Sequence, residues 1–138
     1  MPNVTVTRRA HFAAAHRLFQ SEWSEERNRS VFGDCANPNW HGHNYEIDVT
    51  VEGEIDPATG YVLDLKQLRE IVEQRVVSEL DHGNLNLDVP WLSGVNPTTE
   101  NLVVAIWNRL ADVMPGHARL ARIVLWETPR NYVEYTGE

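Results

Sequence analysis

Residues 41–54 read HGHNYEIDVTVEGE, and over residues 43–53 apolar and polar side chains alternate cleanly. Successive side chains of a β-strand point to opposite faces, so this stretch has one apolar face and one polar face. The apolar face consists of Tyr45, Ile47, Val49 and Val51. The pattern predicts a half-buried antiparallel strand, and the other elements can be placed around it.

Three more strands are predicted on either side of this one. Residues 3–12, NVTVTRRAHF, are rich in β-branched side chains and partly alternate, as in a strand. Residues 119–127 and 131–136, RLARIVLWE and NYVEYT, are joined by the short link TPR. They predict a closing β-hairpin.

Two helices are predicted between the strands. Asp64, with a glutamine three positions later, resembles a capping box, and an apolar stripe at helical spacing then continues to Leu80. Thr98 or Thr99 can cap a second helix. Residues 20–40 are charged and contain Asn, Pro and Gly with little periodicity, so they are expected to form a long loop, which in a compact domain is usually functional.

The element order is strand, strand, helix, helix, strand, strand, which is typical of an α+β fold with helices on one face of a sheet. The length of 138 residues and the absence of repeats or linkers predict one domain over residues 1–138. Four strands in a small domain leave two edges and one uncovered face. Such a sheet commonly continues into another subunit, so an oligomer is expected.

The charge balance excludes some classes of partner. The chain has 12 basic and 20 acidic residues, a formal net charge of -8, which argues against nucleic acid or an anionic membrane surface as the main partner. No apolar run approaches the roughly 20 residues that cross a bilayer, and the N-terminus lacks the apolar core of a signal peptide. A cytoplasmic protein is therefore expected.

Two histidines separated by one glycine open the alternating stretch. His41 and His43 can point to the same side if the strand begins this early, and such a pair suits zinc. His16, at the end of the first strand, can supply a third ligand, which is the usual number in catalytic zinc sites. The alternative is a surface turn with solvated histidines.

Cys35 is the only cysteine, so it cannot form an internal disulfide. It can close a structural zinc site of three histidines and one thiolate. It can also be a base or nucleophile beside the metal, or a buried inert thiol.

Carboxylates appear at two other informative places. Asp81 precedes His82, and such a pair can act as a proton relay, although the end of a helix also favours histidine for electrostatic reasons. Glu127 ends an apolar strand face, where a carboxylate needs a basic partner or a ligand. An amino-pyrimidinone ring would match it through two N–H groups; a solvated glutamate is the alternative.

Taken together, the motifs resemble those of the 6-pyruvoyltetrahydropterin synthase family. They are FAAAHRL, CANPNWHGHNY, VEGEIDPATGYVLDLKQL, LDHGNLNLDVPW, PTTEN, WET and YTGE, in this order over nearly the whole chain. Trp40 stands where a small residue often precedes HGH in that family. The resemblance implies a tunnelling fold, in which a four-stranded antiparallel sheet with two helices on one face assembles into a β-barrel. A homo-hexamer of two trimers, with active sites between subunits, is implied as well.

The resemblance also implies roles for the candidate residues. His16, His41 and His43 would bind Zn2+, and Cys35, Asp81 and His82 would transfer protons without the thiol being a ligand. Three residues would lie near the anchoring carboxylate of Glu127 at the pterin ring: Thr98, Thr99 and Glu100. The implied reaction converts 7,8-dihydroneopterin triphosphate to 6-pyruvoyltetrahydropterin and triphosphate, with no external redox cofactor.

Three alternatives remain open from the sequence. A 6-carboxytetrahydropterin synthase would act on the same substrate and also release acetaldehyde, but its members usually have three residues between cysteine and HGH, where this chain has five. A non-catalytic zinc-binding module would use Cys35 as a ligand. A pterin-binding aldolase or epimerase would rely on a lysine, and Lys66 at a helix start is the only one.

Overall fold

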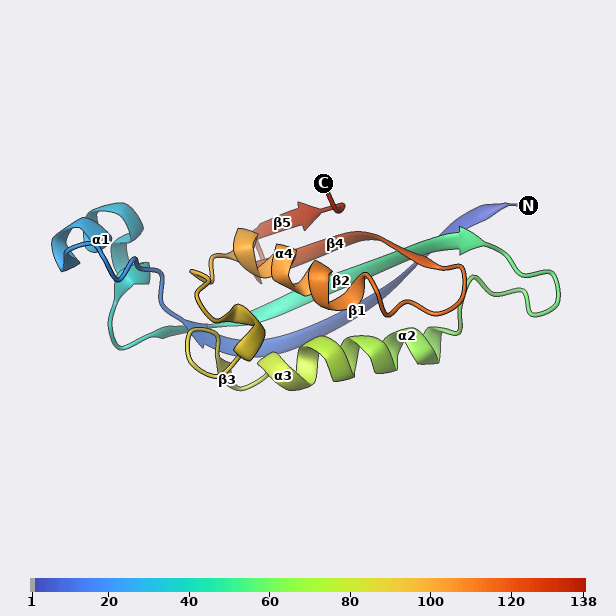
Figure 1. Ribbon diagram of the computed structural model, residues 1–138, viewed down its shortest axis with the longest axis horizontal. Coiled ribbons are helices and arrows are strands. Elements are labelled where there is room, and N and C mark those ends of the chain that lie inside the picture. The colour runs from blue at the N-terminus through green and yellow to red at the C-terminus, as the bar shows by residue number, and fades with distance from the viewer. Residues whose placement is uncertain (1) are drawn as a thin grey trace.

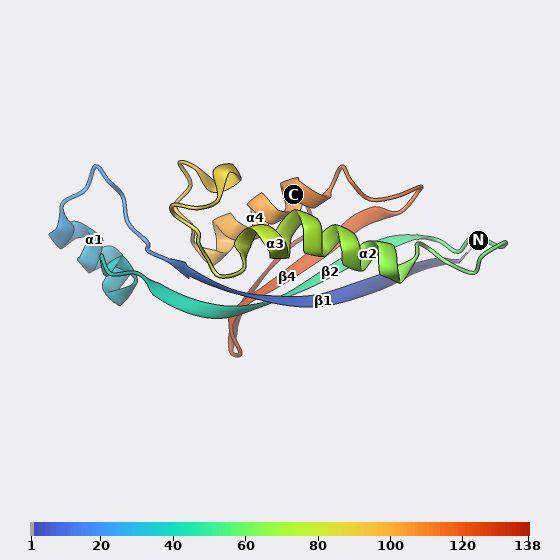
Figure 2. The same cartoon turned by 90° about the horizontal axis from the view of Figure 1, so that it is seen from below.

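The computed structural model describes residues 2–138, which form one sheet with helices packed on a single face (Figures 1 and 2). The sheet order is β3-β1-β2-β4-β5. Its strands are β1 (Asn3–His16), β2 (His41–Glu54), β3 (Gly83–Asn84), β4 (Arg119–Thr128) and β5 (Asn131–Tyr135). The α+β class and the tunnelling-fold arrangement of strands and helices are confirmed.

Helices cover one face of the sheet, as Figure 2 shows from below. The first runs continuously through α2 (Leu65–Val72), a π-helical segment η2 (Glu73–Val77) and α3 (Ser78–Leu80). The second is α4 (Thr99–Leu110), preceded by the 3-10 turn η3 (Pro90–Leu92). Asp64 and Thr98 cap α2 and α4 as expected, each accepting a hydrogen bond from a backbone N–H of the first turn. None of the helices in residues 2–138 combines the length and the apolar character needed to span a bilayer.

The expected four-stranded antiparallel sheet needs one correction. A fifth strand, β3, has only two residues and pairs in parallel with Ala14 and Ala15 of β1. Backbone hydrogen bonds hold it there, from His82 N–H to the Ala13 carbonyl at 2.6 Å and from Leu85 N–H to the Ala15 carbonyl at 2.8 Å. Such a short strand depends on its neighbour rather than on its own sequence pattern.

The expected loop over residues 20–40 also needs a correction, because it contains the helix α1 (Glu25–Phe32) and the 3-10 turn η1 (Gly33–Ala36). Ser24 caps α1 by accepting a hydrogen bond from the Arg27 N–H, and two glutamates occupy the first turn. Trp23 stacks on Phe32, with ring centroids 5.9 Å apart. These local interactions form a small helix at the edge of the molecule, far from the main helical layer in Figure 1.

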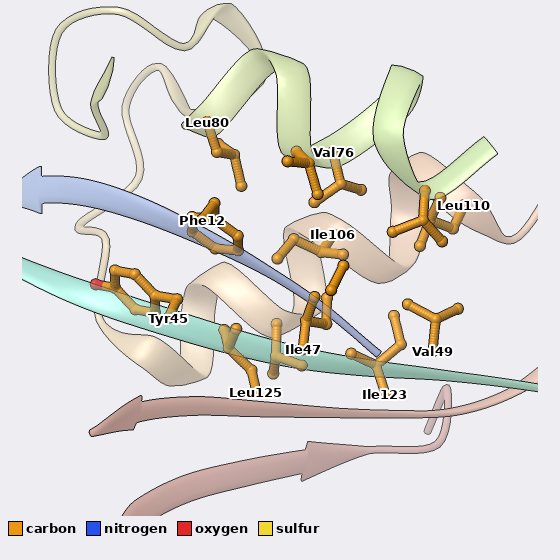
Figure 3. Packing of buried hydrophobic residues seen from close by; sticks show 14 of the residues in the cluster. Phe12, Tyr45, Ile47, Val49, Val76, Leu80, Ile106, Leu110, Ile123 and Leu125 are labelled. Atoms are coloured by element: carbon orange, nitrogen blue, oxygen red, sulfur yellow. The ribbon is translucent and has the colours of Figure 1, made fainter. Parts of the chain in front are cut away.

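The hydrophobic core lies between the sheet and its helices (Figure 3). Phe12 stacks on Tyr45 across β1 and β2, with centroids 4.9 Å apart. Ile47, Ile106 and Leu125 are fully buried between these layers. β1 and β2 pair without a register shift over 14 residues, from Asn3 with Glu54 to His16 with His41. This long ribbon carries the apolar core along most of its covered face and the three histidines at one end.

Candidate active site

Three histidines meet at the end of the β1–β2 ribbon. His16 pairs with His41 in the antiparallel register, and His43 lies two residues further along on the same face. The ring centroid of His16 is 4.4 Å from that of His41 and 5.1 Å from that of His43, and the last two are 5.0 Å apart. One ring nitrogen from each lies within 4.8 Å of the other two. β2 begins early enough to bring the three side chains together.

The surroundings of these rings leave nitrogens free. The Nδ1 of His16 is 2.8 Å from the Pro97 carbonyl, which can only accept, so Nδ1 carries the proton and Nε2 keeps its lone pair. The Nε2 atoms of His16 and His43 and both ring nitrogens of His41 are buried without a hydrogen-bond partner in residues 2–138. Buried polar atoms are rarely left unpaired. Burial lowers the pKa of His16 and of His41, which favours the neutral imidazole that binds metals. Three imidazoles whose ring nitrogens are free fit a metal such as zinc.

Glu127 lies beside the histidines near the end of β4. Its Oε1 is 3.8 Å from Nε2 of His43, and its Oε2 accepts a hydrogen bond from the hydroxyl of Thr99, the first residue of α4. Thr99 is buried, and Thr98 holds this helix start by accepting from the Asn101 N–H at 3.1 Å. The carboxylate is therefore fixed by α4 and keeps its other oxygen toward the histidine cluster.

A cleft of about 580 Å³ opens beside Glu127 and His43. It lies where β4 separates from β2 beyond the pair of Glu46 with Trp126, which is the last in their register. Asp81 and His82 also line it. The cleft thus brings together the Glu127 carboxylate, one histidine of the cluster and the Asp81–His82 pair.

Asp81 and His82 interact directly, which their adjacency alone did not establish. The Oδ2 of Asp81 is 3.0 Å from Nδ1 of His82, and its Oδ1 accepts from the Ala13 N–H at 2.8 Å. The hydrogen bond from Ala13, followed by that from His82, lowers the pKa of Asp81. His82 has a φ of 61°, and its side chain is 85% exposed at the mouth of the cleft. The pair is oriented by β1 and open to the cleft.

Cys35 lies in η1, half-buried, and does not line this cleft. Burial raises the pKa of its thiol, and the negative charges of Glu127 and Asp34 act in the same direction. A bound metal cation would act in the opposite direction and favour the thiolate. Thr98 and Glu100 do not line the cleft either, whereas Thr99 reaches it through Glu127.

Several residues that line the cleft were not expected from the sequence. His11 of β1 and Trp126 of β4 both line it. They lie on the face of their strands opposite the core, and one signal for them is their position in the sequence next to Phe12 and Glu127, two residues that also line the cleft. Strand alternation identifies core residues, and it gives no sign that the opposite face of these strands borders a cleft.

The comparison with known proteins identifies the family. A model of the 6-pyruvoyl tetrahydropterin synthase family matches residues 5–138. The chain belongs to this family. A 6-pyruvoyl tetrahydrobiopterin synthase from Pongo abelii is 49% identical over 133 residues, which are 96% of this chain and 91% of the relative. The family comprises pterin synthases, so its members are enzymes that act on pterins.

Structural similarity agrees with the sequence. The 6-pyruvoyl tetrahydropterin synthase of Caenorhabditis elegans superposes with a TM-score of 0.93 at 38% identity, covering 100% of this chain and 98% of that one. Another relative has a different name, the dihydroneopterin monophosphate aldolase of Pyrococcus furiosus. It is 40% identical over 119 residues, which are 86% of this chain and 85% of the aldolase. The chain is thus similar both to proteins named as synthases and to one named as an aldolase.

Proposed function

We propose that this protein is a zinc-dependent lyase that converts 7,8-dihydroneopterin triphosphate to 6-pyruvoyltetrahydropterin and triphosphate. The observation that carries the proposal is the cluster of His16, His41 and His43, whose buried nitrogens lack partners within the described chain, beside the carboxylate of Glu127. Family membership supplies the pterin class of substrate. The whole chain, residues 1–138, would form one catalytic domain.

The three histidines would hold Zn2+. The fit rests on the free ring nitrogens and on the Pro97 carbonyl, which fixes the tautomer of His16. When bound, zinc would supply Lewis acidity toward the hydroxyl oxygens of the substrate side chain. Cys35 is not needed as a ligand, because three protein ligands leave a position open for substrate.

Glu127 would anchor the pterin ring. An ionised carboxylate accepts from the adjacent N–H and NH2 groups of an amino-pyrimidinone in a bidentate arrangement. The Thr99 hydroxyl donates to one carboxylate oxygen and so fixes its orientation. Thr98 and Glu100 would serve this subsite indirectly, through the start of α4 that presents Thr99.

Cys35, Asp81 and His82 would move the protons. The ring gains the two electrons that the side chain loses, and triphosphate leaves from that side chain, so no external oxidant or reductant is required. The Cys35 thiolate would take a proton on one side of the substrate, and the Asp81–His82 pair would exchange protons with the solvent-exposed side.

The assembly and the location follow as part of the proposal. The edge of β1 over residues 3–12 pairs only with β2 within residues 2–138, and β5 is an edge strand. Open edges of this kind suit closure of a barrel between copies of the chain. We expect a homo-hexamer with sites between subunits, which light scattering on the zinc-loaded protein would distinguish from a trimer. The cytoplasmic location remains a prediction.

Product analysis tests the reaction. The zinc-loaded protein is incubated with 7,8-dihydroneopterin triphosphate, and the pterin product and released phosphate species are identified by mass spectrometry. We expect 6-pyruvoyltetrahydropterin with triphosphate. A carboxypterin with acetaldehyde would identify the alternative synthase, which the named relatives do not favour. Cleavage that releases the side chain as an aldehyde, without loss of triphosphate, would indicate aldolase chemistry instead.

Replacing the single thiol separates catalysis from metal binding. In Cys35→Ala we expect zinc content to stay at the wild-type level while turnover collapses, because the thiol acts beside the metal. Loss of zinc together with the thiol would contradict the catalytic assignment and support a closed, non-catalytic site.

A further inference from the structure

The four residues that follow His16 form a segment outside helices and strands that is held by groups from other parts of the chain. Each backbone N–H of residues 17–20 donates to a group from another part of the chain: Arg17 to Asn86 Oδ1 at 2.9 Å, Leu18 to the Cys35 carbonyl at 2.8 Å, Phe19 to Asn96 Oδ1 at 3.2 Å, and Gln20 to Asn28 Oδ1 at 2.8 Å. No strand pairs with this segment in the part of the chain that the structure describes. Three side-chain amides and one backbone carbonyl thus accept the hydrogen bonds that a neighbouring strand would otherwise accept.

Two asparagine amides each pair with both backbone groups of one residue in this segment. Asn86 accepts from the Arg17 N–H and also donates from Nδ2 to the Arg17 carbonyl at 2.9 Å. Asn28, which is buried, makes the same two-way contact with Gln20, donating to its carbonyl at 3.0 Å. Both ends of the segment are therefore paired through N–H and C=O at once, as in a sheet.

The segment is hydrogen-bonded to η1, the turn that contains Cys35. The Leu18 N–H holds the Cys35 carbonyl, and the side chain of Arg17 donates from Nε to the carbonyl of Ala36 at 2.8 Å. The Arg17 guanidinium lies over the ring of Phe19, 4.1 Å from its centroid, which fixes the direction of the Nε–H. Ala36 is buried, so its carbonyl depends on this donor.

We propose that Arg17 is a positioning residue that fixes the Cys35 turn relative to the metal-binding histidines. It follows His16 directly in the chain, and its side chain donates a hydrogen bond to the residue directly after Cys35, so it links the immediate neighbours of both functional side chains. This inference rests on the proposed function, because it assigns Cys35 a role beside the metal.

A different role for Arg17 would be electrostatic, as a cation that holds the triphosphate. The observed contacts favour positioning, because Nε donates to a backbone carbonyl and the guanidinium carbon lies over the Phe19 ring. The two roles respond differently to lysine, which keeps the charge but lacks the planar group that stacks and donates from Nε together.

Three variants test the proposal: Arg17→Ala, Arg17→Lys and the control Arg27→Ala. Arg27 also covers an aromatic ring, that of Trp23 at 3.9 Å, but makes no side-chain hydrogen bond to the Cys35 turn. We expect both Arg17 variants to keep wild-type zinc content and KM while kcat falls by about 10- to 100-fold, the size of effect that a misplaced catalytic group produces. Arg27→Ala should stay near wild type. Recovery of turnover in Arg17→Lys, with an effect in Arg17→Ala confined to KM, would overturn the proposal in favour of triphosphate binding.

The single cysteine gives a readout that needs no substrate. The rate of Cys35 alkylation by iodoacetamide is measured at neutral pH with and without zinc, and thermal unfolding confirms that each variant is folded. We expect zinc to change the rate in the wild type and in Arg27→Ala, and the ratio of the two rates to approach one in both Arg17 variants. A wild-type ratio in Arg17→Ala, or a ratio of one in the wild type itself, would overturn the proposal. Failure of the wild type to form the expected product would instead reject the proposed reaction and leave this ratio measurable.

Discussion

The covered face of the β1–β2 ribbon has two regions that obey the same alternation but do different things. In the middle of the ribbon, Phe12, Ile47 and Val49 are almost completely buried against the helices. At the end, His16, His41 and His43 replace these apolar side chains and leave nitrogens without partners among residues 2–138. Strand pairing therefore supplies position in both regions, whereas side-chain chemistry decides whether a position contributes to stability or to ligand binding.

The largest effect should come from breaking the histidine end. In His41→Ala we expect zinc to be lost and kcat/KM to fall by more than about 10³-fold, because a metal supplies several kcal/mol of charge stabilisation. The free energy of unfolding without metal should change little, since the lost packing is offset by removal of two buried nitrogens that have no partner in the described chain. Metal analysis, steady-state kinetics and urea unfolding measure the three quantities. His117→Ala, at the opposite end of the sheet, is the control, and its ring bonds the Glu54 carbonyl.

The opposite response is expected in the middle of the ribbon. Ile47→Ala removes a fully buried side chain that does not line the cleft. It should lower the free energy of unfolding by about 2–5 kcal/mol. Urea unfolding followed by circular dichroism measures the loss. Turnover per folded, zinc-loaded molecule should stay close to wild type, and a selective loss of zinc would contradict the separation of the two regions.

Glu127 lies at the boundary between the apolar middle of the sheet and the histidine end, because it ends the apolar face of β4. Glu127→Gln should keep zinc and fold but lower kcat/KM by roughly 10- to 100-fold, as expected when a charged hydrogen-bond acceptor worth 1.5–3 kcal/mol is lost. Steady-state kinetics with the pterin substrate measures the change. Glu134→Gln is a matched control, since Glu134 pairs with Arg122 on the uncovered face at 2.7 Å. Equal losses in the two variants would contradict a specific role for Glu127.

The smallest effect should be on the pH dependence of the free energy of unfolding, through Asp81 beside β1. The folded state lowers the pKa of Asp81 below its ordinary value of 3.8, so this carboxylate contributes stability above pH 3.8 that is lost as pH falls through the folded pKa. Asp81→Asn cannot titrate and should therefore lose less stability than the wild type between about pH 5 and pH 2. Thermal unfolding across this range measures the difference. Parallel curves for the two proteins would show that the hydrogen bond from Ala13 does not favour the charged form.

The parts of the fold predicted correctly depend on regular patterns. Alternation in β2 and β4 placed His43 and Glu127 on the covered face, and antiparallel pairing placed His16 beside His41. Both helix starts followed from their capping residues. These features are set by local geometry, so a single sequence is enough to infer them.

The parts that were missed depend on contacts between distant residues. β3 exists because backbone groups near residue 83 bond to β1, and the segment after His16 is held by asparagines as far away as residue 96. No periodicity marks such contacts. The helix α1 is a different case, since Ser24 and the two glutamates after it are a recognisable helix start. The helix has few apolar residues, so its sequence shows no amphipathic stripe.

The position of the ligands along the chain has a consequence for biosynthesis. All three histidines belong to one hairpin, which is complete at residue 54, whereas the carbonyl that orients His16 comes from residue 97 and the carboxylate from residue 127. A ribosome that works from the N-terminus releases the whole ligand set before it has made the groups that enclose it. If the histidines bind the proposed metal, its capture would therefore be able to begin on the nascent hairpin, and Glu127, the proposed substrate anchor, is the last of these groups to be synthesised.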